Sequence, residues 1–554
     1  MSKPAGLFVI EREDKDEEVE LLASLGLQRG EDGLISWRAD SKDHPRNWTA
    51  LRKTFDTTVI IFLEFFVTVI STAGASAAHA AQSRDGMGNT SSILAFTFIY
   101  NLGQALGGLV TPALSELIGR RTPYLVACIA FSAACLLTGL APNSSIPHAS
   151  PSSSSSSSSP SATGATAACV WVGRFVAGFA SAVPAVVTAG SVHDMFGARR
   201  RVWLVAVWNA GSTAGLCLGP VYGAYILAAC GGDGDEWRWV FRISAAVTAV
   251  CFVCLLGVRE SRPSRIMKRK LAELREQISL GEGPAARVDG ESLNWFNPDH
   301  APDARMMVKL VIVQPLQLLG TEPIVIMITI ISAVSWGIIY LFTESLPDVY
   351  LSMSEAGFTR TTSSLAFLAL LPGVGLSFLP RLWDQRVVRK GLQRSEGIQP
   401  EDKVIGFAVA APALAIGLIW FSWTVPPAIT SAHWMVPMAA LVPVGFAVNE
   451  MAYTLSAYLT DAYQLYAASA FCGLAFVRAL VSGLMPLVAQ QMYPGLGANV
   501  AGTIVACFAL VFCLAPWIFF RYGKRLRERS PFAKHSLESH RRSQIHFSKA
   551  SRDV

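Results

Sequence analysis

The stretch "TPALSELIGRRTPYL" (residues 111–125) places one carboxylate and two guanidinium groups between two long apolar runs. Its charged side chains are Glu116, Arg120 and Arg121. A bilayer core of ~30 Å needs about 20 mostly apolar residues as a helix, and both flanking runs reach that length. If both runs cross a membrane, the charges lie at a span end, where they anchor the helices, operate a gate, or do both.

The composition indicates a membrane protein. Of the 554 residues, 52% are hydrophobic and 16% are charged, whereas a soluble fold of this length carries far more surface charge. The first 53 residues are polar and lack the apolar stretch of a cleavable signal peptide, so we expect the first span to act as its own insertion signal. Most of the ten cysteines lie inside apolar runs, where we expect them to pack rather than to bind a metal.

Apolar runs recur along the chain and predict twelve spans. We place them near 54–78, 92–115, 122–141, 168–192, 202–229, 239–258, 323–345, 362–380, 404–424, 434–458, 467–489 and 499–520. The predicted fold is therefore an all-α membrane protein with two six-helix, pseudo-symmetric halves. Its parts are an N-terminal tail (1–53), a first half (54–258), a linker (259–322), a second half (323–520) and a basic tail (521–554).

The positions of lysine and arginine predict the orientation. With the N-terminus in the cytosol, three arginines fall in outer loops and three within or at the ends of spans, and the other 40 of the 46 basic residues lie inside. The outer three are Arg84, Arg238 and Arg360, and the span residues are Arg174, Arg242 and Arg478. We therefore expect both termini, the linker and the basic tail to be cytosolic.

This orientation places two glycosylation sequons and a serine-rich tract outside. The sequons are "NTS" at Asn89 and "NSS" at Asn143, and the tract at 151–161 is expected to be a flexible linker. On the inner side, the stretch after Arg259 begins basic and predicts a surface helix along the inner leaflet, with anionic lipid near Arg265, Lys268, Arg269 and Lys270. Beside a span, we expect those charges to meet lipid and not nucleic acid.

Two six-span halves joined by a linker are typical of a transporter whose substrate site lies near the membrane midplane. The fourth span ends in "GSVHDMFGARRR" and the tenth in "YLTDAYQLYAAS", so each carries an aspartate, Asp194 or Asp461, at its inner end. The halves repeat little else in sequence.

The opening stretch resembles the loop 2–3 signature of the major facilitator superfamily, in the form found in fungal twelve-span drug:proton antiporters. Further stretches match the same group in order between about residues 40 and 529. They are "HPRNW" (44–48), "GRFVAGFASAVP" (173–184), "GLCLGPVYG" (215–223), "WRWVF" (237–241), "PEDKV" (400–404), "WFSWT" (420–424), "HWMVP" (433–437), "YLTDAYQLYAASA" (458–470) and "MPLVAQQMYPGLG" (485–497). The chain departs from the pattern at Ala224, Arg242 and Glu450.

The resemblance implies roles for several of these positions. An inner-face gate would use Glu116, Arg120, Arg121, Asp194 and Asp461, and the alternative is anchoring alone. Arg174 would couple proton movement to transport, and the alternative is a structural hydrogen bond to the backbone of span one or five. The antiporter motif of span five would comprise Gly215, Gly219, Pro220 and Gly223, which also suit close helix packing and a kink.

Spans one, four, seven and ten line the cavity in this superfamily. Glu64 and Glu450 lie in spans one and ten, so both are candidates for the group that carries the proton, with a protonated or paired packing role as the alternative. The aromatic residues that could line the cavity are Trp336, Tyr340, Phe446 and Tyr453. Such side chains suit an amphiphilic or cationic substrate, although each also suits helix packing.

The predicted function is a proton-coupled exporter of small organic compounds such as drugs, polyamines or a secreted metabolite. Its energy source would be the proton gradient, with no cofactor, and we expect a monomer in the plasma membrane, with the vacuolar membrane as the alternative. Uptake by a symporter or uniporter is the second hypothesis. An enzyme would need clustered catalytic or metal-binding side chains, but the nine histidines are scattered, and the nucleotide-binding pattern G-x-x-x-x-G-K-[ST] is absent. A channel or receptor remains a further alternative.

Overall fold

The structure is a computed structural model that describes residues 21–29, 35–85, 87–142, 160–230, 235–280, 309–353, 357–391, 400–429, 432–463, 466–532 and 534. The sequon at Asn143 and residues 151–159 of the serine-rich tract lie outside the described residues.

The predicted spans are confirmed: the described part of the chain contains twelve helices that are long and apolar enough to cross a membrane. Helices are the expected form, because inside a bilayer each backbone N–H and C=O must find its partner within the protein. The first six spans are α2 (Ala50–Asp85), α3 (Asn89–Ile93) with η2 (Leu94–Phe98) and α4 (Ile99–Ile118), α5 (Arg121–Gly139), α6 (Pro160–Met195), α7 (Ala198–Ala229) and α8 (Glu236–Leu256).

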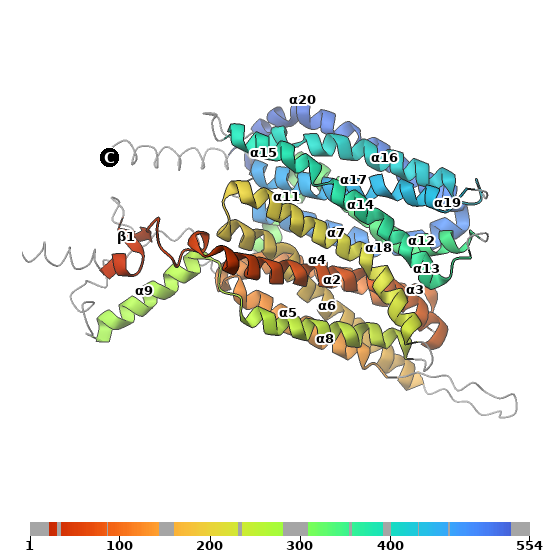
Figure 1. The fold of residues 1–554 in the computed structure, drawn as a ribbon, viewed down its shortest axis with the longest axis horizontal. Helices are drawn as coiled ribbons and strands as arrows, with labels where there is room; N and C mark the ends of the chain where they lie inside the picture. Colours follow the sequence, from red (N-terminus) through yellow and green to blue (C-terminus); the bar gives the residue numbers. More distant parts are fainter. Residues whose placement is uncertain are drawn as a thin grey trace, which may run out of the picture.

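The second half supplies the other six spans. They are α12 (Pro323–Leu351), a broken span of α13 (Arg360–Ser363), η7 (Ser364–Ala369), α14 (Leu370–Leu376) and α15 (Leu379–Gly391), then α16 (Ile405–Thr424), α17 (Met435–Tyr463), α18 (Ala467–Leu496) and α19 (Ala498–Phe512) with α20 (Leu514–Arg529). The helices run side by side as one bundle, with β1 and α9 at one end (Figure 1). We call this end the terminal face and the other end the opposite face.

Each half has its own apolar core. One cluster of buried side chains comes from the first half and includes Phe96, Trp237 and Phe241. A second comes mainly from the second half and also takes in Leu216 and Cys217 of α7. The two halves are therefore packed units that meet along α2, α4 and α7 on one side and α12, α17 and α18 on the other.

The tail and the linker differ from expectation. Strands β1 (Leu27–Arg29) and β2 (Ile35–Trp37) form an antiparallel pair. Their buried side chains Leu27 and Ile35 pack with Leu271 and Leu274 of α9 (Pro263–Leu280). The apolar face of α9, which we expected to lie along the inner leaflet, is therefore covered by the chain's own hairpin. Farther along the linker, η5 (Lys309–Val313) and α11 (Gln314–Thr321) form a short apolar segment against α18.

Candidate functional site

A cavity lies between the two halves. It is lined by residues of α2, α4, α6 and α7 from the first half and of α12 and α18 from the second, and its volume is about 30 Å³. The polar and aromatic residues of its wall are Glu64, Thr68, Gln104, Trp336, Tyr340, Arg478 and Ser482. Of the four spans expected to line the cavity, spans one, four and seven do so, whereas no described residue of span ten belongs to this wall. Spans two, five and eleven (α4, α7 and α18), which we did not expect there, complete it.

Glu64 is the acid of this cavity. Its side chain is 3% exposed, and the Ser212 hydroxyl on α7 donates a hydrogen bond to Glu64 Oε1 at 2.8 Å. Among the described residues, Glu64 Oε2 has no hydrogen-bond partner. One carboxyl oxygen is therefore held in place, and the other can bind a proton or a donor group within the cavity.

Arg478 on α18 brings a positive charge to the same cavity, and sequence reasoning did not include it in the site. The guanidinium carbon lies 4.8 Å from the centre of the Trp336 ring on α12, which is a cation–π contact. Its position in the apolar stretch "AFVRALV" (475–481) is the signal that could have identified it, because an ionisable residue inside a span faces protein or water.

Of the four predicted aromatic residues, two line the cavity and two lie elsewhere. Trp336 and Tyr340 are in the wall, and the Tyr340 hydroxyl is 2.5 Å from that of Ser71, joining α12 to α2. Tyr453 instead packs beneath the Arg381 guanidinium, whose central carbon is 3.6 Å from its ring centre. Phe446 lies beside Gly373, where a Cβ added to the glycine would come within 2.5 Å of the Phe446 backbone nitrogen.

Arg174 takes the structural position named as its alternative role. It is 1% exposed, and its guanidinium donates hydrogen bonds to the carbonyl oxygens of Phe96 at 2.7 Å, Ile70 at 3.3 Å and Ser71 at 3.4 Å. The Tyr100 ring lies 4.5 Å from the guanidinium carbon. Arg174 therefore joins α6 to spans one and two, and its charge faces backbone carbonyls in place of a carboxylate.

Glu450 is engaged by a buried arginine. It forms an ion pair with Arg381 of α15, and the Thr454 hydroxyl donates to Glu450 Oε1 at 3.0 Å. Arg381, itself 1% exposed, also pairs with Asp384 at 2.8 Å. Sequence reasoning missed Arg381 and Asp384, because residues about 70 positions away from Glu450 give no local signal of this contact.

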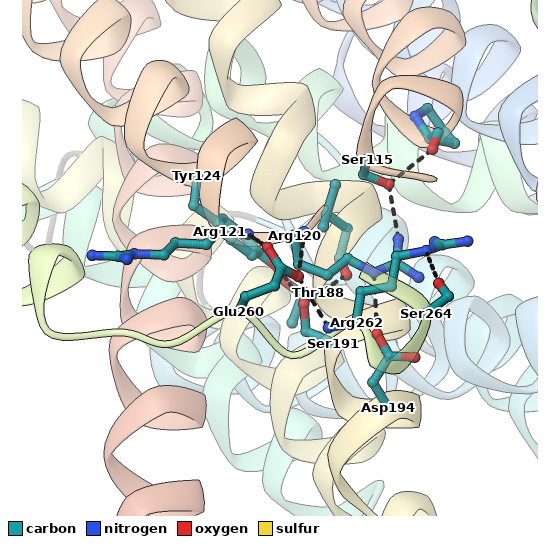
Figure 2. A network of polar contacts seen from close by, with 12 residues as sticks. Ser115, Arg120, Arg121, Tyr124, Thr188, Ser191, Asp194, Glu260, Arg262 and Ser264 are labelled. Atoms are coloured by element: carbon teal, nitrogen blue, oxygen red, sulfur yellow. Dashed lines mark hydrogen bonds and ion pairs between the residues drawn. The ribbon is translucent and has the colours of Figure 1, made fainter. Parts of the chain in front are cut away.

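The predicted gate residue Arg120 is the centre of a polar network at the terminal face (Figure 2). Its Nε lies 3.2 Å from Asp194 Oδ2 at the end of α6, and its Nη1 donates to the Ser115 hydroxyl at 2.8 Å. The Arg120–Asp194 pair suggested by the sequence is therefore present. All three residues belong to the first half, so the pair ties spans two, three and four together within that half.

Glu260, which follows α8, completes this network and was not singled out from the sequence. The backbone N–H groups of Arg120 and Arg121 donate to its two carboxyl oxygens at 2.8 and 3.0 Å. The turn is closed by Gly119, whose φ is +100° and whose added Cβ would lie 2.4 Å from Glu260 Oε2. Arg121 donates to the Leu256 carbonyl at 2.9 Å, whereas Glu116 is exposed and joins none of these contacts.

The second half carries a corresponding pair. Asp461, near the end of α17, lies 2.5 Å from the Lys403 ammonium in the "PEDKV" stretch. In the same stretch, Glu401 pairs with Arg527 of α20 at 2.6 Å. Each half thus has an aspartate on its fourth span that pairs with a basic residue from a loop at the terminal face.

The glycines of span five lie against span one. Added Cβ atoms at Gly215 and Gly219 would each come within 2.0 Å of a threonine hydroxyl on α2, Thr68 or Thr72. At Gly223 the nearest atom is Ser76 Cβ at 2.9 Å. The Thr72 hydroxyl donates to the Leu216 carbonyl at 2.9 Å, a contact that only a close approach of the two helices permits.

At the opposite face, a histidine and a glutamate join the two halves. His79 Nε2 of α2 lies 2.9 Å from Glu344 Oε2 of α12. The predicted sequon residue Asn89 is exposed near this face, and its glycosylation stays a prediction. Contacts between the halves also occur toward the terminal face, where the rings of Trp203 and Phe378 stack with centres 6.3 Å apart.

Comparisons with known proteins agree with the fold described above. Residues 57–469 match the sequence model of the Major Facilitator Superfamily. The fold is similar to the solved structure of the proton:xylose symporter XylE bound to 6-bromo-6-deoxy-D-glucose, with a TM-score of 0.57 and 15% identity, over 85% of this chain and 96% of that one.

Curated relatives cover most of the chain. The multidrug transporter FLU1 of Candida albicans is 26% identical over 507 residues, which are 89% of this chain and 75% of the relative. The efflux pump MFS2 of Trichophyton rubrum is 28% identical over 502 residues, 90% and 77% of the two chains. The ascochitine biosynthesis cluster transporter of Didymella fabae is 26% identical over 509 residues, 91% and 90%. With twelve spans, two packed halves and a family match over most of its length, the chain belongs to the major facilitator superfamily of membrane transporters.

Proposed function

We propose that this transporter is a proton-coupled exporter of small organic compounds that works by alternating access. The observation that carries the proposal is Glu64, a buried carboxyl group with one unengaged oxygen in a cavity between the two halves. A group in this position can exchange its proton with whichever side the cavity faces, and proton and substrate then compete for one space.

The distribution of contacts supports alternating access. The His79–Glu344 contact joins the halves at one face, and the stacked rings of Trp203 and Phe378 join them nearer the other. Each contact is small enough to break and re-form as the halves rock, while the separate apolar cores keep each half intact.

Export is favoured over uptake by the relatives and by span five. Several relatives are named multidrug transporters or efflux pumps. The close fit of Gly215 and Gly219 against α2 is what the antiporter motif needs, because a tight helix pair leaves no side path for protons. We propose the plasma membrane as its location, with the vacuolar membrane as the alternative, and the terminal face as the cytosolic side.

The test compares three strains: one in which the gene is deleted, one with the wild-type gene and one with the Glu64→Gln variant. We expect the deletion to retain compounds inside the cell, to lower their extracellular level and to raise sensitivity to some drugs. A protonophore should reproduce the retention in wild type. If no compound shifts, or if uptake is lost instead of efflux, the exporter proposal is wrong.

A further inference from the structure

The cavity holds two groups of opposite charge, one from each half. Glu64 of α2 has an oxygen with no hydrogen-bond partner among the described residues. The guanidinium of Arg478 on α18 is partly exposed and makes the cation–π contact with Trp336, and in the described part of the chain it has no hydrogen bond and no ion pair. Both side chains belong to the wall of the same cavity.

The two charges interact electrostatically but no hydrogen bond joins them in the structure as described. The hydroxyl of Ser482 is buried in the same wall and, like Glu64 Oε2, has no hydrogen-bond partner among the described residues. Buried polar groups are normally satisfied, and a charge left without a partner is expensive in a site of low dielectric constant. The wall therefore presents an acceptor, a bidentate donor and a hydroxyl that a bound molecule can engage.

The charge pattern selects among substrate classes. A simple cation that binds Glu64 places its charge near that of Arg478, and a simple anion that binds Arg478 places its charge near that of Glu64. Each arrangement adds a repulsion inside the protein, where charge interactions are stronger than in bulk water. A molecule that carries both an amine and a carboxylate meets both wall charges with its own opposite charges.

We propose that the substrate is amphoteric: its carboxylate, or a comparable anionic group, binds Arg478, and its amine binds Glu64. Its apolar body lies against Trp336 and Tyr340. This inference rests on the proposed exporter function and adds a reason for the coupling. The amine and a proton compete for the same carboxyl oxygen. The carrier therefore moves substrate outward without a proton on Glu64, and it returns without substrate and with a proton there.

The test sorts the compounds retained by the deletion strain according to charge. An amphoteric compound binds a cation exchanger in strong acid and an anion exchanger in strong base, whereas a simple amine binds only the first and a simple acid only the second. We expect the compounds retained in the deletion strain, and released by the wild-type strain, to bind both resins. Compounds that bind one resin or neither overturn the inference while leaving the exporter function standing.

Variants at Arg478 supply the second arm. Arg478→Gln should lower efflux of the retained compounds about tenfold, as expected for one lost charge-assisted hydrogen bond, and Arg478→Lys should restore part of it. Both variants are compared with wild type for level in the membrane fraction and elution as a single species. If Arg478→Gln folds and exports at the wild-type rate, Arg478 does not bind the substrate. If Arg478→Gln fails to fold, the same comparison is made with Arg478→Lys. The inference is supported if Arg478→Lys exports esterified compounds at the wild-type rate but exports the free acids more slowly than wild type.

Discussion

At the scale of single residues, Arg120 shows how one side chain joins distant parts of a half. Its backbone N–H donates a hydrogen bond to Glu260, and its guanidinium donates to both Ser115 and Asp194. The sequence predicted that Arg120 and Asp194 lie on the same side of the membrane, because both follow directly after apolar runs. It could not identify Glu260, since nothing local distinguishes that carboxylate from the other acids near the inner ends of the spans.

The Arg120–Asp194 pair can be tested by a double-mutant cycle. The two side chains are 13% and 12% exposed and 3.2 Å apart, so their coupling should be about 1 kcal/mol, at the upper end for pairs near water. We expect Arg120→Ala and Asp194→Ala to slow transport with membrane insertion intact, and the double variant to be little worse than either. Arg121→Ala is the control: its guanidinium binds a carbonyl, so its effect should add to that of Asp194→Ala. Full additivity for Arg120 would contradict the pair.

The two buried glutamates should respond differently to the same substitution. Glu64→Gln should remove the pH dependence of transport, because an amide cannot carry the proton. Glu450→Gln should keep the pH dependence and instead lower the free energy of unfolding by roughly 3 kcal/mol, because among the described residues it leaves Arg381 with Asp384 alone as an ionic partner. Transport rates over a range of pH and thermal unfolding of the purified protein separate the two effects. Unchanged pH dependence in Glu64→Gln would remove Glu64 from the mechanism.

At the scale of elements, the sequence predicts the spans well and their contacts poorly. Length and apolarity are local properties, so all twelve spans are found, although α2 extends beyond the predicted 54–78 to Ala50 and Asp85 because a helix continues past the apolar core. Which helices face the cavity is a property of the packed bundle. The sequence therefore did not predict that α18 lines the cavity, and it placed Tyr453 in the cavity wall, where the structure does not have it. The sequence predicted that α9 lies along the inner leaflet, whereas in the fold its apolar face packs against the β1–β2 hairpin.

The contact of α7 with α2 predicts that alanine substitutions at two glycines of α7 have very different effects on stability. An added Cβ at Gly219 would lie 2.0 Å from Thr72 Oγ1 and 2.3 Å from the Val69 carbonyl oxygen, and the backbone cannot move aside locally. We expect Gly219→Ala to destabilise the protein by about 1–3 kcal/mol. At Gly211 the nearest atom is 3.5 Å away, so Gly211→Ala should be neutral or slightly stabilising. Thermal unfolding of the two variants in detergent compares them directly, and equal effects would contradict the close contact.

At the scale of the whole molecule, the halves meet on both sides of the cavity. The amide of Asn209 and the hydroxyl of Thr213, both on α7, donate to Asn449 Oδ1 on α17 at 2.8 and 2.7 Å. The His79–Glu344 contact lies beyond the cavity toward the opposite face. Every one of these contacts joins residues more than 200 positions apart, which explains why none was predicted from the sequence. Substrate can pass only if the contacts on one side separate while those on the other remain.

This requirement predicts that a covalent link at one face stops transport. Cysteines at His79 and Glu344 are shorter than the side chains that now meet between α2 and α12, so their thiols face each other across a gap that a short bifunctional methanethiosulfonate reagent can span. We expect transport by His79→Cys/Glu344→Cys to fall at least to about a tenth after this cross-linking and to recover on reduction, because alternating access needs this face to open. The single variants His79→Cys and Glu344→Cys, treated in the same way, control for the ten native cysteines. Mass spectrometry of the peptides establishes that the link has formed. Full transport by the linked protein would mean that the halves do not separate at this face, and the rocking motion assigned to them would be wrong.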